Sequence, residues 1–266
     1  MSSTLIPPRR TRPSTVAVGI TLAVLAVHVL AWNETEFSPG SLVDGWRGMA
    51  DFLGDALPPD LTWATVLRPS LEAALVTLYI GLLGTTLSIP SALLLALGAS
   101  KATTRGPVLY QACRSLLSFL RSVPDVVFAL IFVTAVGLGP FAGVLALICH
   151  NTGVMGKLWA EAMEESDPGP REALRTTGAG PIQIAVNAVL PTVLPQFVGL
   201  LLYRFDVNVR SSLVLGLVGA GGIGFLINQS IKLFRFDQMV THILVVLVLV
   251  VAVDQLSAVV RRRIGA

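Results

Sequence analysis

The sequence predicts an all-α protein that crosses a membrane several times. Of its 266 residues, 53% are hydrophobic and only 13% are charged, and the mean hydropathy is +0.75. Water-soluble domains carry roughly 25% charged residues. Several apolar stretches also approach the ~20 residues that a helix needs to cross the hydrocarbon core of a bilayer. We therefore expect a polytopic membrane protein with about six transmembrane helices.

Residues 1–65 are expected to form a cytosolic tail, a first membrane helix and an external linker. The tail contains Arg9, Arg10 and Arg12, and an apolar segment follows from Thr15 to Trp32. This order also fits a secretory signal, but the apolar run is long for a signal core, which favours a retained helix. The linker from Asn33 to Leu67 is acidic and holds Arg47 as its single basic residue. Because Lys and Arg mark the cytosolic side, the linker is placed outside.

Residues 66–260 are expected to form the transmembrane domain. Its predicted spans are 71–97, 116–136, 141–159, a helix from about 182 that contains Pro191 and Pro195, and 239–260. The loop that holds Lys101 and Arg105 and the polar loop 161–180 then lie in the cytosol. The basic end, 261–266, begins with three consecutive arginines and should also stay inside. Both termini are therefore predicted to be cytosolic.

A glycine-rich segment precedes the last span. Gly219, Gly221 and Gly224 fit the spacing of a dinucleotide-binding loop. That loop requires a strand before it and a helix after it, whereas membrane helices flank this segment, so the dinucleotide reading is rejected. If Ser211–Ile227 crossed the membrane, the final arginines would lie outside, so we expect the segment to enter and return. Together with Gly222, these glycines either shape a re-entrant loop that faces a substrate pathway or allow close helix packing.

Other functional classes find little support in the sequence. Cys113 and Cys149 lack metal-binding or disulfide spacing, and the three histidines are isolated. The basic residues are scattered among apolar spans, which argues against nucleic acid as a partner. No arrangement of nucleophile, base and acid suggests an enzyme. We expect no metal, no cofactor and no catalytic residue in this chain.

The polar loop 161–180 contains the signals of a short helix. Pro170 or Arg171 can begin it, Gly178 is well placed to terminate it, and Pro181 can begin the next helix. Such a helix is too polar to insert into the membrane. A docking surface for a soluble partner is therefore the favoured interpretation, and a solvated turn is the alternative.

The same loop resembles the EAA loop of binding-protein-dependent ABC importer permeases. That pattern reads E-A-A, three residues, G, nine residues, I-x-L-P, and here Glu172, Ala173, Leu174, Gly178 and Pro191 occupy its positions. Leu174 replaces the third-position alanine, and Ala188 replaces the isoleucine. The resemblance implies that this loop is a coupling helix that binds an ATPase subunit, with Glu172, Ala173 and Gly178 as the central contacts.

Within that family, the chain is most similar to permeases of phosphonate importers, through residues 141–165 and 202–224. Phosphite or phosphate importers could share these segments. The resemblance implies a type I permease core of five helices plus an extra N-terminal helix, in the inner membrane. It also implies a second copy of this chain, two ATPase subunits that bind ATP and Mg²⁺, an external phosphonate-binding protein, and alternating access. The alternative is a secondary anion carrier without an ATPase, although the paired broken helices of that class are not visible.

Charged residues within the spans suggest where an anion could bind. Arg204 has no acid at a helical offset and is the candidate for contact with a phosphonate oxygen, with Asn208 and Ser211 as neutral donors. Two pairs four residues apart are expected to neutralise each other as structural ion pairs, namely Asp206 with Arg210 and Arg121 with Asp125.

Overall fold

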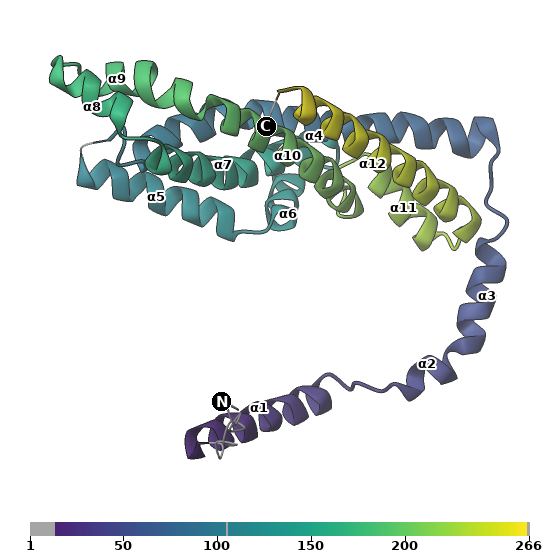
Figure 1. Cartoon of the computed structure of the whole chain (residues 1–266). Helices are drawn as coiled ribbons and strands as arrows, with labels where there is room; N and C mark the ends of the chain where they lie inside the picture. Colours follow the sequence, from purple (N-terminus) through teal and green to yellow (C-terminus); the bar gives the residue numbers. More distant parts are fainter. Residues whose placement is uncertain (1–13, 105, 265–266) are drawn as a thin grey trace, which may run out of the picture. The chain divides into compact units, whose positions relative to one another are not determined.

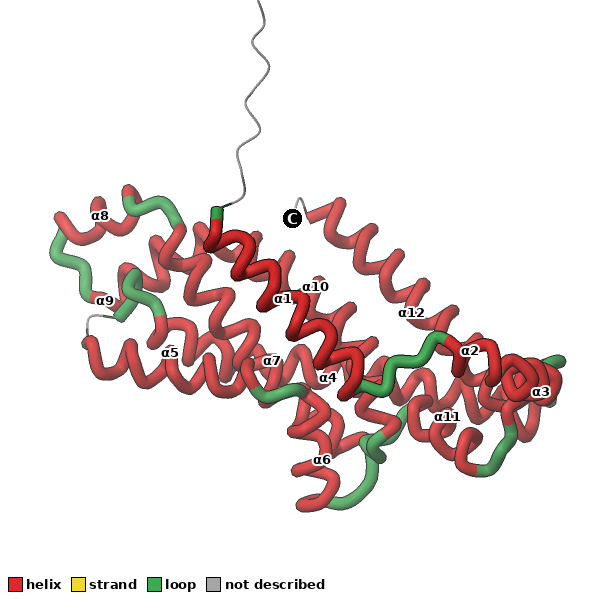
Figure 2. The backbone as a smooth tube through the Cα atoms, turned by 90° about the horizontal axis from the view of Figure 1, so that it is seen from below, coloured by secondary structure: helices red, strands yellow, loops and turns green. Residues whose placement is uncertain are grey.

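Helices form every regular element in the described part of the chain. The computed structural model describes residues 14–104 and 106–264, and all of its secondary structure is helical (Figure 2). Contacts divide the chain into two compact units, Met1–Leu53 and Gly54–Ala266. The predicted all-α class is confirmed.

The first unit holds the predicted N-terminal helix. Helix α1, Thr15–Glu34, begins where the Ser14 side chain accepts a hydrogen bond from the Val16 N–H at 3.2 Å. Its large apolar side chains are exposed all round, which is the pattern of a lipid-facing helix. Helix α2, Gly40–Asp44, follows, and α3, Trp46–Ala56, continues across the boundary between the units. The arginines of the predicted tail, Arg9, Arg10 and Arg12, lie outside the described residues.

The second unit is a helical bundle (Figure 1). Its elements are η1 (Trp63–Leu67), α4 (Arg68–Ala99), α5 (Pro107–Ser122), α6 (Asp125–Val136), α7 (Pro140–Glu165), α8 (Gly169–Thr176), α9 (Pro181–Ile184), η2 (Ala185–Val189), α10 (Leu190–Leu217), α11 (Ile223–Lys232) and α12 (Phe236–Ile264). Within the described residues, five helices including α1 are long and apolar enough to span a membrane, or six if α5 and α6 count as one broken span. The expected number of about six is thereby confirmed.

The third predicted span, 116–136, is wrong as a single helix. The chain bends by 86° between α5 and α6. Val123 has an extended backbone (φ −83°, ψ 122°) because it precedes Pro124, which disfavours helical geometry at the preceding residue. The Val123 carbonyl oxygen lies 3.0 Å from His150 Nδ1, so α7 holds the bend.

Small residues allow α4, α7 and α10 to pack closely at the centre of the bundle. A Cβ atom at Gly84 of α4 would lie 2.5 Å from Leu147 Cβ of α7, and one at Gly81 of α4 would lie 2.8 Å from Val209 Cγ2 of α10. Membrane helices commonly approach each other through such residues. Trp159 and Phe197 stack with their ring centroids 4.7 Å apart and join α7 to α10.

The two ends of the bundle carry different elements. Helices α8 and α9 lie at one end, and α11 with the start of α12 lies at the opposite end (Figures 1 and 2). At the α11 end, the Thr241 hydroxyl donates to the Asp60 carbonyl oxygen at 2.7 Å, which joins the segment before α4 to α12. Hydrogen bonds from the side chain and backbone of Thr62 lower the pKa of the Asp60 carboxyl.

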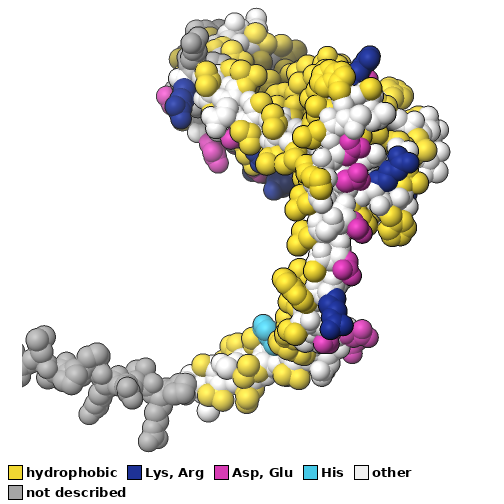
Figure 3. Space-filling model, turned by 90° about the vertical axis from the view of Figure 1, so that its right-hand side faces the viewer, with side chains coloured by type: hydrophobic (Ala, Val, Ile, Leu, Met, Phe, Trp, Pro, Cys, Tyr) yellow, Lys and Arg dark blue, Asp and Glu magenta, His cyan; other side chains and the backbone are white. Residues whose placement is uncertain are grey.

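The surface of the bundle is largely apolar. On the face shown in Figure 3, hydrophobic side chains predominate and charged ones lie in small separate groups. Exposed leucine, valine and isoleucine side chains occur along α4, α10 and α12. In water such an apolar surface would promote aggregation, whereas in a membrane it contacts the apolar lipid chains.

The glycine-rich segment forms a tight turn between α10 and α11. Gly219, Gly221 and Gly222 have φ values of +95°, +80° and +72°, a region that glycine enters without strain. Helix α11 has 10 residues, too few to span a bilayer, so residues 211–227 do not form a crossing helix, as predicted. The Ile223 N–H donates to Thr77 Oγ1 at 2.9 Å. The turn therefore packs against α4, and this geometry supports the close-packing interpretation of the glycines.

We expect Gly222→Val to lower the melting temperature of the purified protein markedly. A Cβ at this position would lie 2.4 Å from Thr77 Oγ1, and the backbone has φ +72°. Overpacking costs about 1–3 kcal/mol, and a non-glycine residue in such a conformation costs about 1–3 kcal/mol more. Gly54→Ala is the control because nothing lies within 4 Å of its added Cβ. Equal melting temperatures for the two variants would contradict the packing role.

Candidate functional site

Helix α8 is capped by hydrogen bonds at both of its ends. At its start, the Gly169 N–H donates to Asp167 Oδ1 at 2.9 Å. At its end, the Gly178 N–H donates to the Arg175 carbonyl at 3.1 Å and the Ala179 N–H donates to the Leu174 carbonyl at 3.2 Å. With Gly178 at φ +81°, this is a Schellman motif. The helix predicted within 161–180, its terminator Gly178 and the start of the next helix at Pro181 are all confirmed.

One face of α8 is free and the other rests on the bundle. Glu172 and Ala173 are exposed, whereas Leu174 is half-buried against the core cluster that includes Trp159 and Ile184. Within the described residues, Glu172 is in no ion pair. Leu174, which departs from the EAA pattern, thus anchors α8 to its own bundle and leaves Glu172 and Ala173 available to a partner.

The chain re-enters the bundle through an irregular helical segment. Pro191 lies in the first turn of α10 and has no N–H to donate to a carbonyl one turn earlier. The preceding turn, η2, is π-helical, a local distortion that accommodates such a break in the hydrogen-bond ladder. Ala188 and Val189 are buried in this turn. Pro191 is exposed and shapes the junction; it does not lie on the free face of α8.

A buried polar cluster lies near the middle of α4, α7 and α10. Arg204 is 8% exposed; its Nε donates to Asn151 Oδ1 at 2.8 Å and its Nη2 donates to Asn208 Oδ1 at 3.1 Å. Asn208 Nδ2 in turn donates to Thr85 Oγ1 at 2.8 Å, and Asn151 Nδ2 donates to Ser88 Oγ at 2.6 Å. Within the described residues, Arg204 forms no ion pair. Its guanidinium donates to the amide oxygens of Asn151 and Asn208.

The cluster contains two of the three polar residues predicted to contact the anion, Arg204 and Asn208. Arg204 and Asn208 are hydrogen-bonded to each other, and one amide hydrogen of Asn208 is donated to Thr85. Among the described residues, no hydrogen bond joins Ser211 to the cluster. Sequence reasoning missed Asn151, Thr85 and Ser88. These three residues could have been recognised as uncharged polar residues inside apolar spans, because polar residues at such positions usually face a partner or a cavity.

The two predicted ion pairs have different outcomes. Arg210 Nη2 lies 2.8 Å from Asp206 Oδ2, as predicted, and 3.7 Å from Asp254 Oδ1 of α12. No ion pair forms between Arg121 and Asp125. The i,i+4 geometry requires a continuous helix, and the bend at Val123–Pro124 separates the two residues onto α5 and α6.

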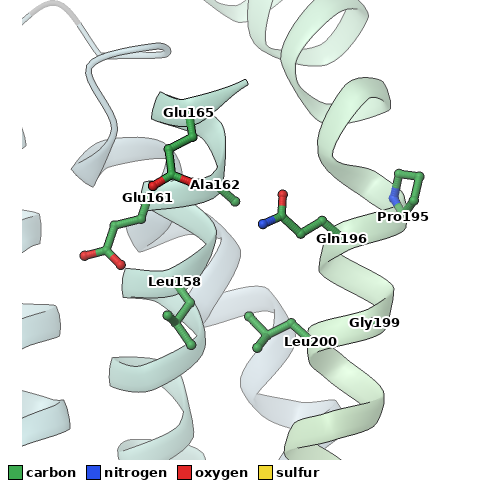
Figure 4. Close-up of a pocket in the computed structure, with 8 residues that line it drawn as sticks. All are labelled: Leu158, Glu161, Ala162, Glu165, Pro195, Gln196, Gly199 and Leu200. Atoms are coloured by element: carbon green, nitrogen blue, oxygen red, sulfur yellow. The ribbon is translucent and has the colours of Figure 1, made fainter. Parts of the chain in front are cut away.

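A cavity of about 650 Å³ opens between α7 and α10 near the α8 end (Figure 4). Gln196 extends from α10 toward α7, and Leu158 and Leu200 lie between the two helices. Glu161 and Glu165 belong to the α7 wall, and the Glu161 carboxylate points away from α10. Neither glutamate forms an ion pair within the described residues. An apolar cavity of about 380 Å³ lies elsewhere on α10 and includes Pro191 and Trp159 in its wall. The first cavity thus combines apolar walls with two glutamates and a glutamine, whereas the lining of the second is almost entirely apolar.

A bundle of membrane-spanning helices that presents a short polar helix at one end is the architecture of a transport permease. Residues 88–266 match the family described as the binding-protein-dependent transport system inner membrane component. The chain belongs to this family and is a permease component of the ABC importer class.

Relatives agree with this assignment, and a solved structure shares the fold. The phosphite transport system permease protein PtxC of Stutzerimonas stutzeri is 38% identical over 247 residues, 92% of this chain and 88% of that protein. The phosphate-import permease protein PhnE of Mycolicibacterium smegmatis is 39% identical over 237 residues, 89% of this chain but only 44% of that protein. An inward-facing structure of the MetNI methionine ABC transporter shares the fold, with a TM-score of 0.59 and 23% identity over 75% of this chain and 96% of that one.

Proposed function

We propose that this chain is the membrane-spanning subunit of an ATP-driven importer of a phosphorus oxyanion, either phosphonate or the related phosphite or phosphate. The names of the relatives support this substrate class, because they include a phosphite permease and a phosphate-import permease at 38% and 39% identity. The observation that carries the transport mechanism is the free face of α8, on which Glu172 and Ala173 are exposed while Leu174 anchors the helix.

The functional unit in this proposal is a complex. Two copies of the chain form the pathway, and two ATPase subunits bind ATP and Mg²⁺ at the cytosolic side. An external binding protein delivers the anion to the α11 end. The positive-inside bias supports this orientation, because the three arginines at 261–263 follow the last span and the linker before α4 is acidic. Both termini are then cytosolic, in the inner membrane.

In this complex, Glu172, Ala173 and Gly178 form the contact with the ATPase subunit. Nucleotide binding brings the ATPase subunits together and displaces α8, and the bundle then switches between its inward-open and outward-open arrangements. A partner can drive such a switch only by binding the two arrangements with different affinity. Pro191 shapes the helix that receives this displacement.

Arg204 provides the positive charge for the anion pathway. Because its guanidinium forms no ion pair among the described residues, its positive charge favours an anion near the middle of the bundle. Asn208 holds the guanidinium in place, and Ser211, half-buried on the same helix, is available as a neutral donor. Gly219, Gly221, Gly222 and Gly224 let the α10–α11 turn pack closely at the outer end of this pathway.

Reconstitution into lipid vesicles tests the proposal. Uptake of radiolabelled phosphonate, phosphite or phosphate should require the chain, its ATPase subunit, its binding protein and ATP together. Retention of the ATPase subunit by the purified chain should depend on residues 161–180. Ion-driven uptake by the chain alone would instead establish the secondary carrier, and the solute bound to the isolated binding protein identifies the oxyanion.

A further inference from the structure

Glu164 joins three elements at the α8 end of the bundle. It lies in the last turn of α7, and its Oε1 accepts the Lys101 backbone N–H at 2.9 Å, in the loop after α4. Both carboxylate oxygens lie 3.3 Å from Arg114 Nη1, on α5. We call Lys101, Arg114 and Glu164 the Glu164 cluster. A single carboxylate thus connects α7 with α5 and with the α4–α5 loop.

Further contacts stiffen this cluster. Arg114 Nη1 also donates to the Tyr110 hydroxyl at 2.5 Å. The Lys101 ammonium and the Arg114 guanidinium lie 5.5 Å and 5.4 Å from the centre of the Tyr110 ring. The side chains of Arg114 and Glu164 are 31% and 25% exposed. Partial burial and several shared partners make such a pair stronger than an isolated surface ion pair.

Helix α8 is tied directly to the end of α7 that carries Glu164. Only Ser166, Asp167 and Pro168 separate the two helices. Arg171 Nη2 donates to the Ser166 carbonyl at 3.4 Å, and the Gly169 N–H donates to Asp167 Oδ1. A cavity of about 330 Å³ is lined by Arg171, Glu172 and Arg175 of α8 on one side and by Lys101 and Glu164 on the other. Displacement of α8 therefore reaches the rest of the bundle through the end of α7 and through Leu174.

We propose that Glu164 is a positioning residue that makes α5 follow the end of α7 when α8 is displaced. Helix α5 leads to the 86° bend at Val123–Pro124, and the His150 ring of α7 contacts that bend. The Glu164 cluster fixes the middle of α5 to α7 through Arg114, and His150 of α7 contacts Val123 at the C-terminal end of α5. Helices α5 and α7 thus move together. A displacement of α8 therefore also displaces the bend between α5 and α6. This inference rests on the proposed function, since it assigns a transmission path to the same importer.

Glu164→Gln in the complete importer, reconstituted in vesicles, tests the proposal. The amide oxygen can still accept the Lys101 N–H, but the charge that holds Arg114 is lost. We expect about two- to thirtyfold less substrate imported per ATP hydrolysed, which corresponds to the 0.5–2 kcal/mol by which single residues typically alter the coupling free energy between two sites. Binding of the ATPase subunit should be unchanged and the variant should remain folded, with a small decrease in melting temperature from the loss of the ion pair. Arg114→Met should give the same loss, and the double variant should be no worse than either single variant.

Glu72→Gln is the matched control. Arg68 and Glu72 form a 2.9 Å ion pair within α4 that joins no other element, so import per ATP should stay at the wild-type value. Wild-type coupling in both Glu164→Gln and Arg114→Met would overturn the proposal, and so would additive losses in the double variant. Loss of ATPase binding in Glu164→Gln would overturn it too, by making the residue part of assembly. Failure of the wild-type complex to import any phosphorus oxyanion would instead contradict the proposed function.

Discussion

Ala173→Arg should lower uptake by the assembled importer more than tenfold while the chain still folds. Ala173 is exposed on α8, so a larger side chain meets no neighbour in the isolated chain. In the proposed complex, the same position is covered by the ATPase subunit. A charge buried there without a partner costs about 2–5 kcal/mol, which exceeds the 1.4 kcal/mol that corresponds to a tenfold loss of affinity. Copurification of the ATPase subunit and uptake in vesicles both measure the effect.

Ala64→Arg is the control for this substitution. Ala64 is also an exposed alanine in a helical segment, but it lies in η1, before α4, at the other end of the bundle. Its substitution should leave ATPase retention unchanged. If Ala173→Arg retains the ATPase subunit as well as the wild type does, α8 is not the docking surface, and the coupling role assigned to Glu172 and Ala173 is wrong.

Local signals explain why α8 could be predicted so closely. Proline at the start of a helix, glycine after its end and a following proline each act on the backbone within a few residues. The structure places the Schellman turn at Gly178 and the next helix at Pro181 accordingly. The apolar spans were equally accessible, because membrane length alone dictates about 20 consecutive apolar residues.

Features that depend on contacts between distant helices could not be predicted. Arg204 is hydrogen-bonded to Asn151, which lies 53 residues away in the sequence, and Asn208 is hydrogen-bonded to Thr85, which lies 123 residues away. Such partners depend on the rotation of each helix against its neighbours, which hydropathy does not encode. The bend at Pro124, in contrast to these contacts, had a local signal in the sequence, namely the proline itself. Because apolar stretches lie on both sides of Pro124, residues 116–136 were predicted to form one continuous span. The Arg121–Asp125 ion pair was wrongly predicted as a result.

Arg204→Met should reduce oxyanion uptake to less than about a tenth while the bundle remains folded. The substitution removes the charge and leaves Asn151 Oδ1 and Asn208 Oδ1 without their donors. Hydrogen bonds to charged groups contribute about 1.5–3 kcal/mol. Relief of the cost of burying a charge offsets this loss, so the melting temperature should change little. The effect should therefore appear in transport and not in the amount of folded protein.

Arg204→Lys separates charge from geometry in the same experiment. Lysine keeps the positive charge but cannot donate to two amide oxygens in the fixed arrangement of a guanidinium, so uptake should fall between the wild type and Arg204→Met. Arg68→Met, which removes an exposed arginine from α4, should transport normally. Normal uptake by Arg204→Met at normal expression would mean that the buried cluster only joins α4, α7 and α10. The charge that attracts the anion would then have to come from another part of the complex.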